Sequence, residues 1–198
     1  MLAYTRAREW DEDLDVVFTT DHGELQGDFG LLFKGPYHVD GLVRLPLVWR
    51  PAPGRAVAPS VVRAPVSLVS LAATFLAVAG RPAPAWVEGA ALPVSDLDAA
   101  QRGFTSTVTE WDSALFGVDV HLRTLVTRDH LFTRYAPGTM HDGTEAELYV
   151  LADDPLQRDN RSEDPALAGV RAELDERLDE HEGRPGDRAT PGLLVAPV

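Results

Sequence analysis

The sequence predicts an α/β protein in which a strand-and-loop region precedes a small antiparallel sheet packed on a C-terminal helix. A near-continuous apolar and β-branched run over residues 14–20 fits a strand that is buried on both faces, as in the parallel sheets of α/β proteins, and this run ends at an acidic residue. From about residue 100 onward, short β-prone segments alternate with turn residues. A last apolar stripe at helical spacing follows them, formed by Leu167, Val170, Leu174 and Leu178.

Composition narrows the class of protein. The chain has 198 residues, 44% of them hydrophobic, which is enough to bury a core. Its formal net charge of −13 disfavours binding to nucleic acid or to anionic lipid. The absence of Cys excludes a disulfide, a thiolate zinc site and a cysteine nucleophile. The chain opens on a polar segment and its longest apolar run, 68–79, is too short to span a bilayer, so we expect a soluble, cytoplasmic protein without nucleic-acid or membrane partners.

The first half reads as two strands and a helix joined by long loops. The run 14–20 predicts a strand covered on both faces, and a glycine-rich loop follows it. A second strand is expected over 42–49, with Pro46 moving it to an edge or a bulge. Ser70 is expected to cap a helix that Gly80 ends.

The second half reads as an antiparallel sheet and one helix. Arg128 and Asp129 are expected to turn two of the strands into a hairpin. Asp164 followed by Pro165 is a helix start, and the helix is expected to pack on the sheet and to end at Gly183. The predicted strands are 105–111, 121–127, 130–135 and 147–151.

Asp21 and His22 are the main candidate site. A carboxylate oxygen and an imidazole nitrogen can both bind a divalent cation. Neighbouring strand residues point to opposite faces, so both reach one ion only if the strand ends there, and Gly23 permits such a bend. Lys34 lies thirteen residues beyond Asp21, and His38 follows four residues later. An ammonium can neutralise an anionic oxyester, and an imidazole can act as a general acid or substrate contact.

The same residues also fit a plainer interpretation, in which Asp21 caps a helix and His22 and Lys34 are surface residues. A weaker candidate for a substrate mouth is the group formed by residues 110–112 with His121 and Arg123.

Several separated segments decide between these interpretations, because together they resemble the sulfatase family of the alkaline-phosphatase-like superfamily. They come in the order of that family and cover roughly residues 14–180. The segments are Val16 to Glu24, Gly27-Asp28, Lys34-Gly35, Arg44 to Val48, the helix Leu71 to Gly80, Glu147-Leu148-Tyr149, and Asp153-Asp154-Pro155 with Asn160.

The resemblance implies a fold and a chemistry. Residues 1–99 would be the C-terminal part of the sulfatase α/β catalytic domain, 100–183 a small α+β subdomain, and 184–198 a tail. Asp21 and His22 would be metal ligands, for Ca²⁺ first and Mn²⁺ second. Lys34 would bind the sulfate, with His38 as a second catalytic candidate. The reaction would be hydrolysis of a small-molecule sulfate ester.

The sequence departs from the family in one important respect. It contains neither C-x-P-x-R nor S-x-P-x-R, the motif whose first residue becomes formylglycine in sulfatases. We therefore expect the isolated chain to be inactive. Two alternatives stay open: a phosphonate or phosphate ester hydrolase of the same superfamily, and a non-catalytic fragment or a subunit that completes a split enzyme with a separately encoded N-terminal half.

Overall fold

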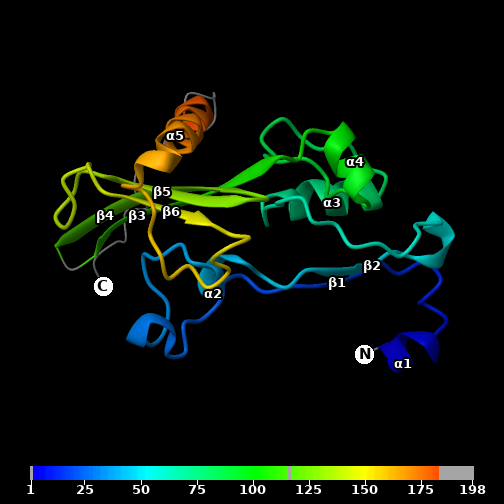
Figure 1. Cartoon of the computed structure of the whole chain (residues 1–198). Coiled ribbons are helices and arrows are strands. Elements are labelled where there is room, and N and C mark those ends of the chain that lie inside the picture. The colour runs from blue at the N-terminus through cyan, green and yellow to red at the C-terminus, as the bar shows by residue number, and fades with distance from the viewer. Residues whose placement is uncertain (1, 116, 183–198) are drawn as a thin grey trace.

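The computed structural model describes residues 2–115 and 117–182. Two sheets and several short helices follow one another along the chain (Figure 1). In chain order the helices and strands are α1 (Leu2–Arg6), β1 (Val16–Phe18), the 3₁₀ turn η1 (Asp28–Gly30), α2 (Asp40–Val43), β2 (Val48–Arg50), η2 (Pro53–Arg55), α3 (Ser70–Val78), α4 (Asp96–Gln101), β3 (Ser106–Leu115), β4 (Val118–Thr127), β5 (His130–Ala136), β6 (Ala146–Val150), η3 (Pro165–Leu167) and α5 (Ala168–Glu182).

The larger sheet is an antiparallel meander in the order β3-β4-β5-β6, with α5 across one face (Figure 1). The predicted antiparallel sheet and its tight hairpin are confirmed: β4 ends at Thr127 and β5 begins at His130. The apolar stripe of α5 packs where the sequence places it, against Val108, Leu125, Phe132, Ala146 and Leu148 of the sheet.

The start of α5 also follows the prediction. The Asp164 carboxylate accepts a hydrogen bond from the Ala166 amide, with Pro165 as the first residue of the turn η3. The turn then continues into α5 because its last residue, Leu167, leads directly into helical Ala168. The predicted end at Gly183 and the tail 184–198 lie outside the described residues.

The smaller sheet differs from the prediction. Strand β1 has only three residues, and it pairs antiparallel with β2 instead of lying in a buried parallel sheet. Phe18 and its partner Val48 are 63% and 62% exposed, because no other described segment covers this face. The second strand begins at Val48, not at residue 42, since residues 40–43 form α2 and Pro46 lacks an amide hydrogen.

The residues that begin and end helices α3 and α4 agree only in part with the helix signals of the sequence. Ser70 is not the N-cap of α3 but its first helical residue, because the N-cap position is taken by Val69, which makes no side-chain cap hydrogen bond. The Ser70 carbonyl accepts a hydrogen bond from the hydroxyl of Thr74. Gly80 ends this helix in a left-handed conformation, as expected. Helix α4 was not predicted, although the Ser95 hydroxyl accepts from the Asp98 amide as an N-cap does.

The loop between β1 and β2 folds back on itself and is held by backbone hydrogen bonds. The amide of Gly23 donates to the Leu42 carbonyl at 2.9 Å, and the amide of Glu24 donates to the Gly41 carbonyl at 3.1 Å. These bonds bring the backbones so close that a Cβ at Gly23 would lie 1.9 Å from the Gly41 oxygen. The role of Gly23 is therefore close approach of two backbones, in addition to the bend that the sequence indicates.

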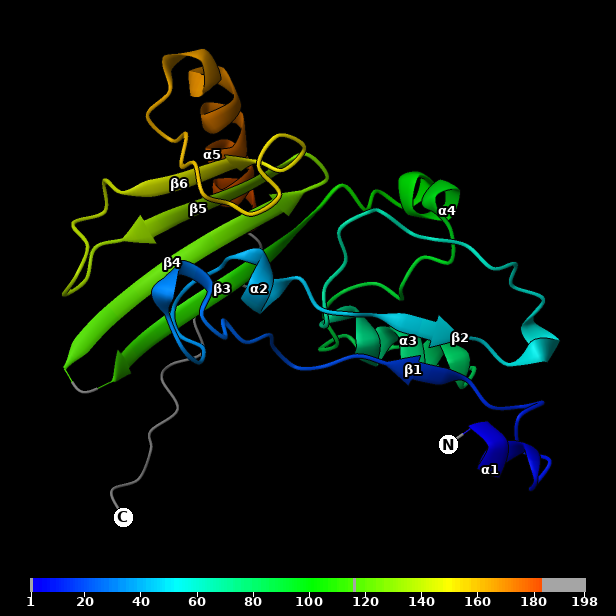
Figure 2. The same ribbon diagram turned by 60° about the horizontal axis from the view of Figure 1, so that its bottom comes forward.

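This loop docks on the sheet face opposite to α5 (Figure 2). On that face the His38 Nδ1 is hydrogen-bonded to the Thr124 hydroxyl at 2.8 Å, and Thr124 is bonded in turn to Thr133. Two residues later, Asp40 is bonded to the side chain of Gln157 through both its amide and its carboxylate. The C-terminal unit thus holds the loop at two neighbouring points.

The turn after β6 explains part of the family motif in structural terms. The Asn160 side chain accepts from the Leu148 amide and donates to the Ala146 carbonyl, which satisfies the outer edge of β6. The Asp154 carboxylate accepts from the amides of Arg158 and Asp159. These residues shape the turn that presents Gln157. The division into domains at residues 99 and 183 stays a prediction.

In the part of the chain that the structure describes, no helix is both long enough and apolar enough to cross a lipid bilayer.

We predict that Gly23→Ala destabilises the protein by more than about 2 kcal/mol, because the new methyl overlaps a backbone oxygen that cannot swing aside. Gly54→Ala is the matched control, since nothing lies within 4 Å of the Cβ it would add. Urea denaturation of both variants checks this. A Gly23→Ala protein within about 0.5 kcal/mol of the parent would show that the loop is not packed as described.

The burial of His38 predicts a loss of stability in mild acid. Burial, and then the charge of Arg123, lower the pKa of His38 from 6.5 to about 4. The unfolded chain therefore binds the proton more readily, so the stabilisation is complete above pH 6.5 and declines as the pH falls toward 4. The loss should be on the order of 2–3 kcal/mol.

Denaturation at several pH values tests this slope. His38→Gln should flatten it, whereas His130→Gln should leave it unchanged. An equal slope in the His38→Gln protein would assign the acid sensitivity to other groups.

Candidate functional site

Asp21 and His22 lie at the end of the segment that follows β1, and their side chains are close to each other. Asp21 Oδ2 is 3.7 Å from His22 Nε2. The His22 Nδ1 is 2.8 Å from the Gly23 carbonyl oxygen, to which it can donate. In that tautomer Nε2 carries the lone pair, and it faces the same side as the free oxygen of Asp21.

The two carboxylate oxygens of Asp21 have different surroundings. Oδ1 accepts hydrogen bonds from the His22 amide at 3.0 Å and from the Thr20 hydroxyl at 3.3 Å. Oδ2 lies on the side of the His22 ring. The hydrogen bond from its own backbone amide, and then the charge interaction with His22, lower the pKa of Asp21. The carboxylate is therefore ionised at neutral pH and its side chain is 85% exposed, so it is accessible to a cation.

The donor set fits a divalent metal but does not complete its coordination. Oxygen and imidazole nitrogen 3.7 Å apart can bind adjacent positions of one ion. Across residues 2–115 and 117–182 there is no group of three His, Asp or Glu side chains that would hold a metal by itself. Another carboxylate of the loop is that of Asp28, whose Oδ2 is 3.3 Å from the position that a Cβ would take on Gly41. Since Ca²⁺ takes roughly six to eight ligands, the described residues supply part of a site.

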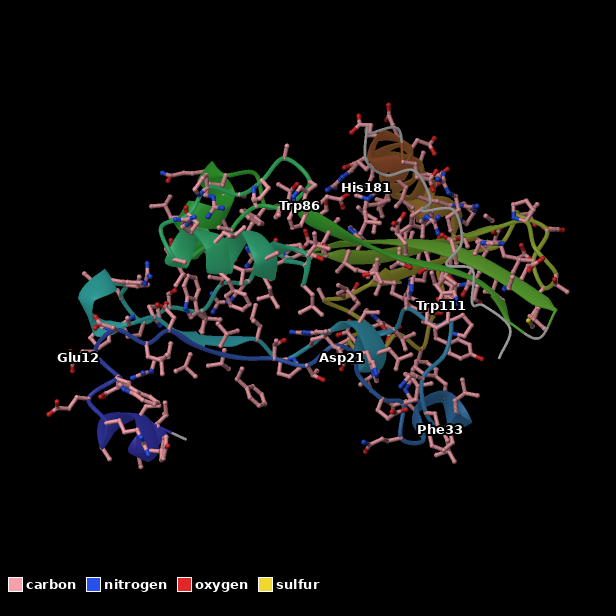
Figure 3. All side chains as sticks on the ribbon, turned by 180° about the vertical axis from the view of Figure 1, so that it is seen from behind. Glu12, Asp21, Phe33, Trp86, Trp111 and His181 are labelled. Atoms are coloured by element: carbon pink, nitrogen blue, oxygen red, sulfur yellow. The ribbon has the colours of Figure 1, made fainter. Side chains whose placement is uncertain are left out.

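Lys34 belongs to the same folded loop. The preceding residue, Phe33, accepts a hydrogen bond from the Leu25 amide at 3.1 Å, so this part of the loop lies beside the segment that follows His22. Figure 3 shows Asp21 beside α2 and Phe33 at the tip of the loop, away from the sheet. The Lys34 side chain is exposed. Convergence of its amine with the Asp21 carboxylate stays a prediction.

His38 is buried, whereas a general acid or substrate contact, the role that the sequence suggests for it, would need access to substrate. Its side chain is buried at 5% exposure because the loop packs it against β4, where it is bonded to Thr124. A catalytic role for His38 stays a prediction, and the interaction that the structure gives it is the docking of the loop.

The weaker candidate group divides between the two faces of the sheet. The Asp112 carboxylate accepts from His121 and Arg123 at 2.8 Å each, and Arg123 also approaches Glu182 of α5. These three residues are thus on the α5 face, opposite to the loop. Trp111 packs on the other face with Val120, Leu122 and Tyr135.

Sequence reasoning missed Gln157. It is 1% exposed, has a positive φ of 54°, and reaches Asp40 across 117 residues of sequence. The available signal was the spacing between Asp154 and Asn160, which encloses it.

Comparisons with known proteins place this geometry in a family context. No family model matches the sequence. The chain is 30% identical over 168 residues to the uncharacterized sulfatase YidJ of Escherichia coli (strain K12), an alignment that covers 84% of this chain and 32% of YidJ. The chain therefore spans about a third of the length of the curated relative that it matches.

Solved structures share the fold. A protein solved in complex with its substrate D-glucosamine-2-N,6-O-disulfate superposes with a TM-score of 0.76 at 21% identity, over 95% of this chain and 39% of that one. The phosphonate monoester hydrolase of Agrobacterium radiobacter gives 0.72 at 24% identity, over 90% of this chain and 36% of that one. The matched segments, the similarity to YidJ and the alkaline-phosphatase-like fold show that the chain is related to the sulfatases and corresponds to the C-terminal part of these larger proteins.

Proposed function

We propose that this chain supplies part of the metal site of a hydrolase that cleaves small-molecule sulfate esters. The observation that carries the proposal is the pair of Asp21 Oδ2 and His22 Nε2, 3.7 Å apart, with the imidazole oriented by the Gly23 carbonyl. The relation to sulfatases and the sulfated substrate of one structural neighbour support the substrate class.

Each candidate residue would have a distinct role in this reaction. Asp21 and His22 would hold a divalent cation, Ca²⁺ in the first place and Mn²⁺ in the second. When bound, the cation would polarise the sulfate oxygens and neutralise charge on them. Lys34 would bring a mobile positive charge to the same anionic group from the loop. His38 is a second catalytic candidate by sequence, and in the described conformation it would act by holding the loop on the sheet.

A phosphonate or phosphate ester hydrolase is the second candidate, and the similarity in fold to a phosphonate monoester hydrolase favours it specifically. Asp21, His22 and Lys34 offer a cation and a positive charge, which suit sulfuryl and phosphoryl groups alike. A nucleophile would distinguish the two chemistries, and the sequence has no formylglycine motif.

The remaining ligands and the nucleophile would come from a part that packs on the first half of the chain. That surface exposes large apolar side chains at the β1–β2 pair and at the loop tip, where Leu32 and Phe33 are 69% and 73% exposed. Exposed apolar groups of this size mark a surface suited to burial. A separately encoded N-terminal half is one source of this part. A non-catalytic fragment without such a partner is the alternative.

We predict that Mn²⁺ binds weakly and at one place on this chain. At substoichiometric Mn²⁺ the amide signals of residues 21–24 and 41–42 should broaden in nitrogen-15 correlation spectra, because these amides lie around the Asp21 and His22 donors. Asp21→Asn should abolish the broadening. Asp129→Asn, which removes an exposed carboxylate in the β4–β5 turn, should not change it.

Broadening centred elsewhere, for example on residues 141–145, would refute the assignment of Asp21 and His22 as ligands. The reaction class is tested by adding a sulfatase N-terminal segment that carries C-x-P-x-R and assaying an aryl sulfate against an aryl phosphonate. Faster cleavage of the phosphonate would replace the first candidate by the second.

A further inference from the structure

We infer that Gln157, in the turn after β6, is a positioning residue for the metal-ligand pair of Asp21 and His22. This inference rests on the proposed function, since it assigns Gln157 to the same site. Gln157 touches neither ligand, and it acts through Asp40 and helix α2.

The Gln157 side chain forms part of the contact between the turn after β6 and the start of α2. Its carbonyl oxygen accepts from the Asp40 amide at 2.7 Å, and its amide group donates to Asp40 Oδ1 at 3.1 Å. The residue is 1% exposed and adopts a φ of 54°, a left-handed conformation that is unfavourable for a non-glycine residue. A buried side chain held in this conformation by two hydrogen bonds has one well-defined position.

A few hydrogen bonds connect the Gln157–Asp40 contact to Asp21 and His22. Asp40 is the first residue of α2, and the next two residues, Gly41 and Leu42, accept the amide hydrogens of Glu24 and Gly23. The Gly23 carbonyl in turn accepts from the His22 ring. Gln157 therefore fixes the α2 backbone against which the ligand segment is bonded.

The chemistry of the contact requires an amide. A carboxylate at position 157 could still accept from the Asp40 amide, but its second oxygen would face Asp40 Oδ1 without a hydrogen between them. Exchanging the two groups restores the pattern, because an amide at position 40 can donate to a carboxylate at position 157. The pair thus offers a rescue that a general loss of packing would not show.

The test compares Gln157→Glu, Asp40→Asn and the double variant with the parent in the full chain. The first readout is hydrogen exchange of the Gly23 and Glu24 amides, which needs no metal. Gln157→Glu should accelerate their exchange by roughly tenfold or more while the amides of β4 and β5 keep their protection. The double variant should return to within a few-fold of the parent.

The second readout is the Mn²⁺ concentration that half-broadens the signals of residues 21–24. Gln157→Glu should raise it by about 10-fold, the lower end of what outer-shell partners of metal ligands contribute. Gln101→Glu introduces the same charge change at an exposed position on α4 and should have no effect on either readout.

Unchanged exchange of Gly23 and Glu24 in Gln157→Glu, or failure of the double variant to restore it, would overturn the inference. If the parent binds no Mn²⁺ at Asp21 and His22, the proposed function fails, and the positioning of the ligand segment is still decided by the exchange data.

Discussion

The attachment of two residues of the loop to the C-terminal unit, His38 to strand β4 and Asp40 to the turn after β6, is the interaction on which the rest of the arrangement depends. The His38 imidazole is bonded to Thr124 of β4, Val39 is buried with Leu25 and Leu42, and Asp40 is bonded to Gln157. These contacts join residues that are 86 and 117 positions apart in sequence. Because the loop is also bonded to itself at Gly23 and Leu25, fixing its second half also fixes the segment that carries Asp21 and His22.

The two faces of the larger sheet make different kinds of contact. The α5 face is an apolar core bordered by ion pairs, among them those of Arg134 with Asp175, Asp179 and Glu182. The opposite face carries two buried hydroxyls, those of Thr124 and Thr133, which are bonded to each other, and Thr124 is also bonded to His38. A hydrogen-bonded contact fixes direction more strictly than an apolar one, because an unpaired buried group is costly. This face is therefore suited to holding a loop in one position.

Local signals in the sequence were sufficient for the C-terminal unit. The β4–β5 turn, the Asp164 cap and the stripe of α5 each depend on neighbouring residues, so their patterns can be seen directly. The family motifs similarly point to Asp21 and His22, which are adjacent in sequence and whose side chains lie 3.7 Å apart, and their role as ligands stays a prediction.

Contacts between residues that are far apart in the chain could not be predicted from the sequence patterns. The run 14–20 looks like a buried strand, but only residues 16–18 pair, and no described segment covers Phe18. His38 looks like a loop residue open to substrate, and its burial depends on Thr124 far along the chain. The spacing between Asp154 and Asn160 indicates a turn around Gln157, but its role depends on Asp40, which is 117 positions away in sequence.

The C-terminal unit holds the loop that carries Asp21 and His22 in a single folded position. Native-state hydrogen exchange of the whole chain tests it most directly. The amides of Gly23, Leu25 and Leu42 all donate to backbone carbonyls. We expect them to be protected to the same degree as the amides of β4, and all of these amides to exchange in one cooperative opening. Exchange of these three amides at the rate of an unfolded chain, while β4 stays protected, would contradict it.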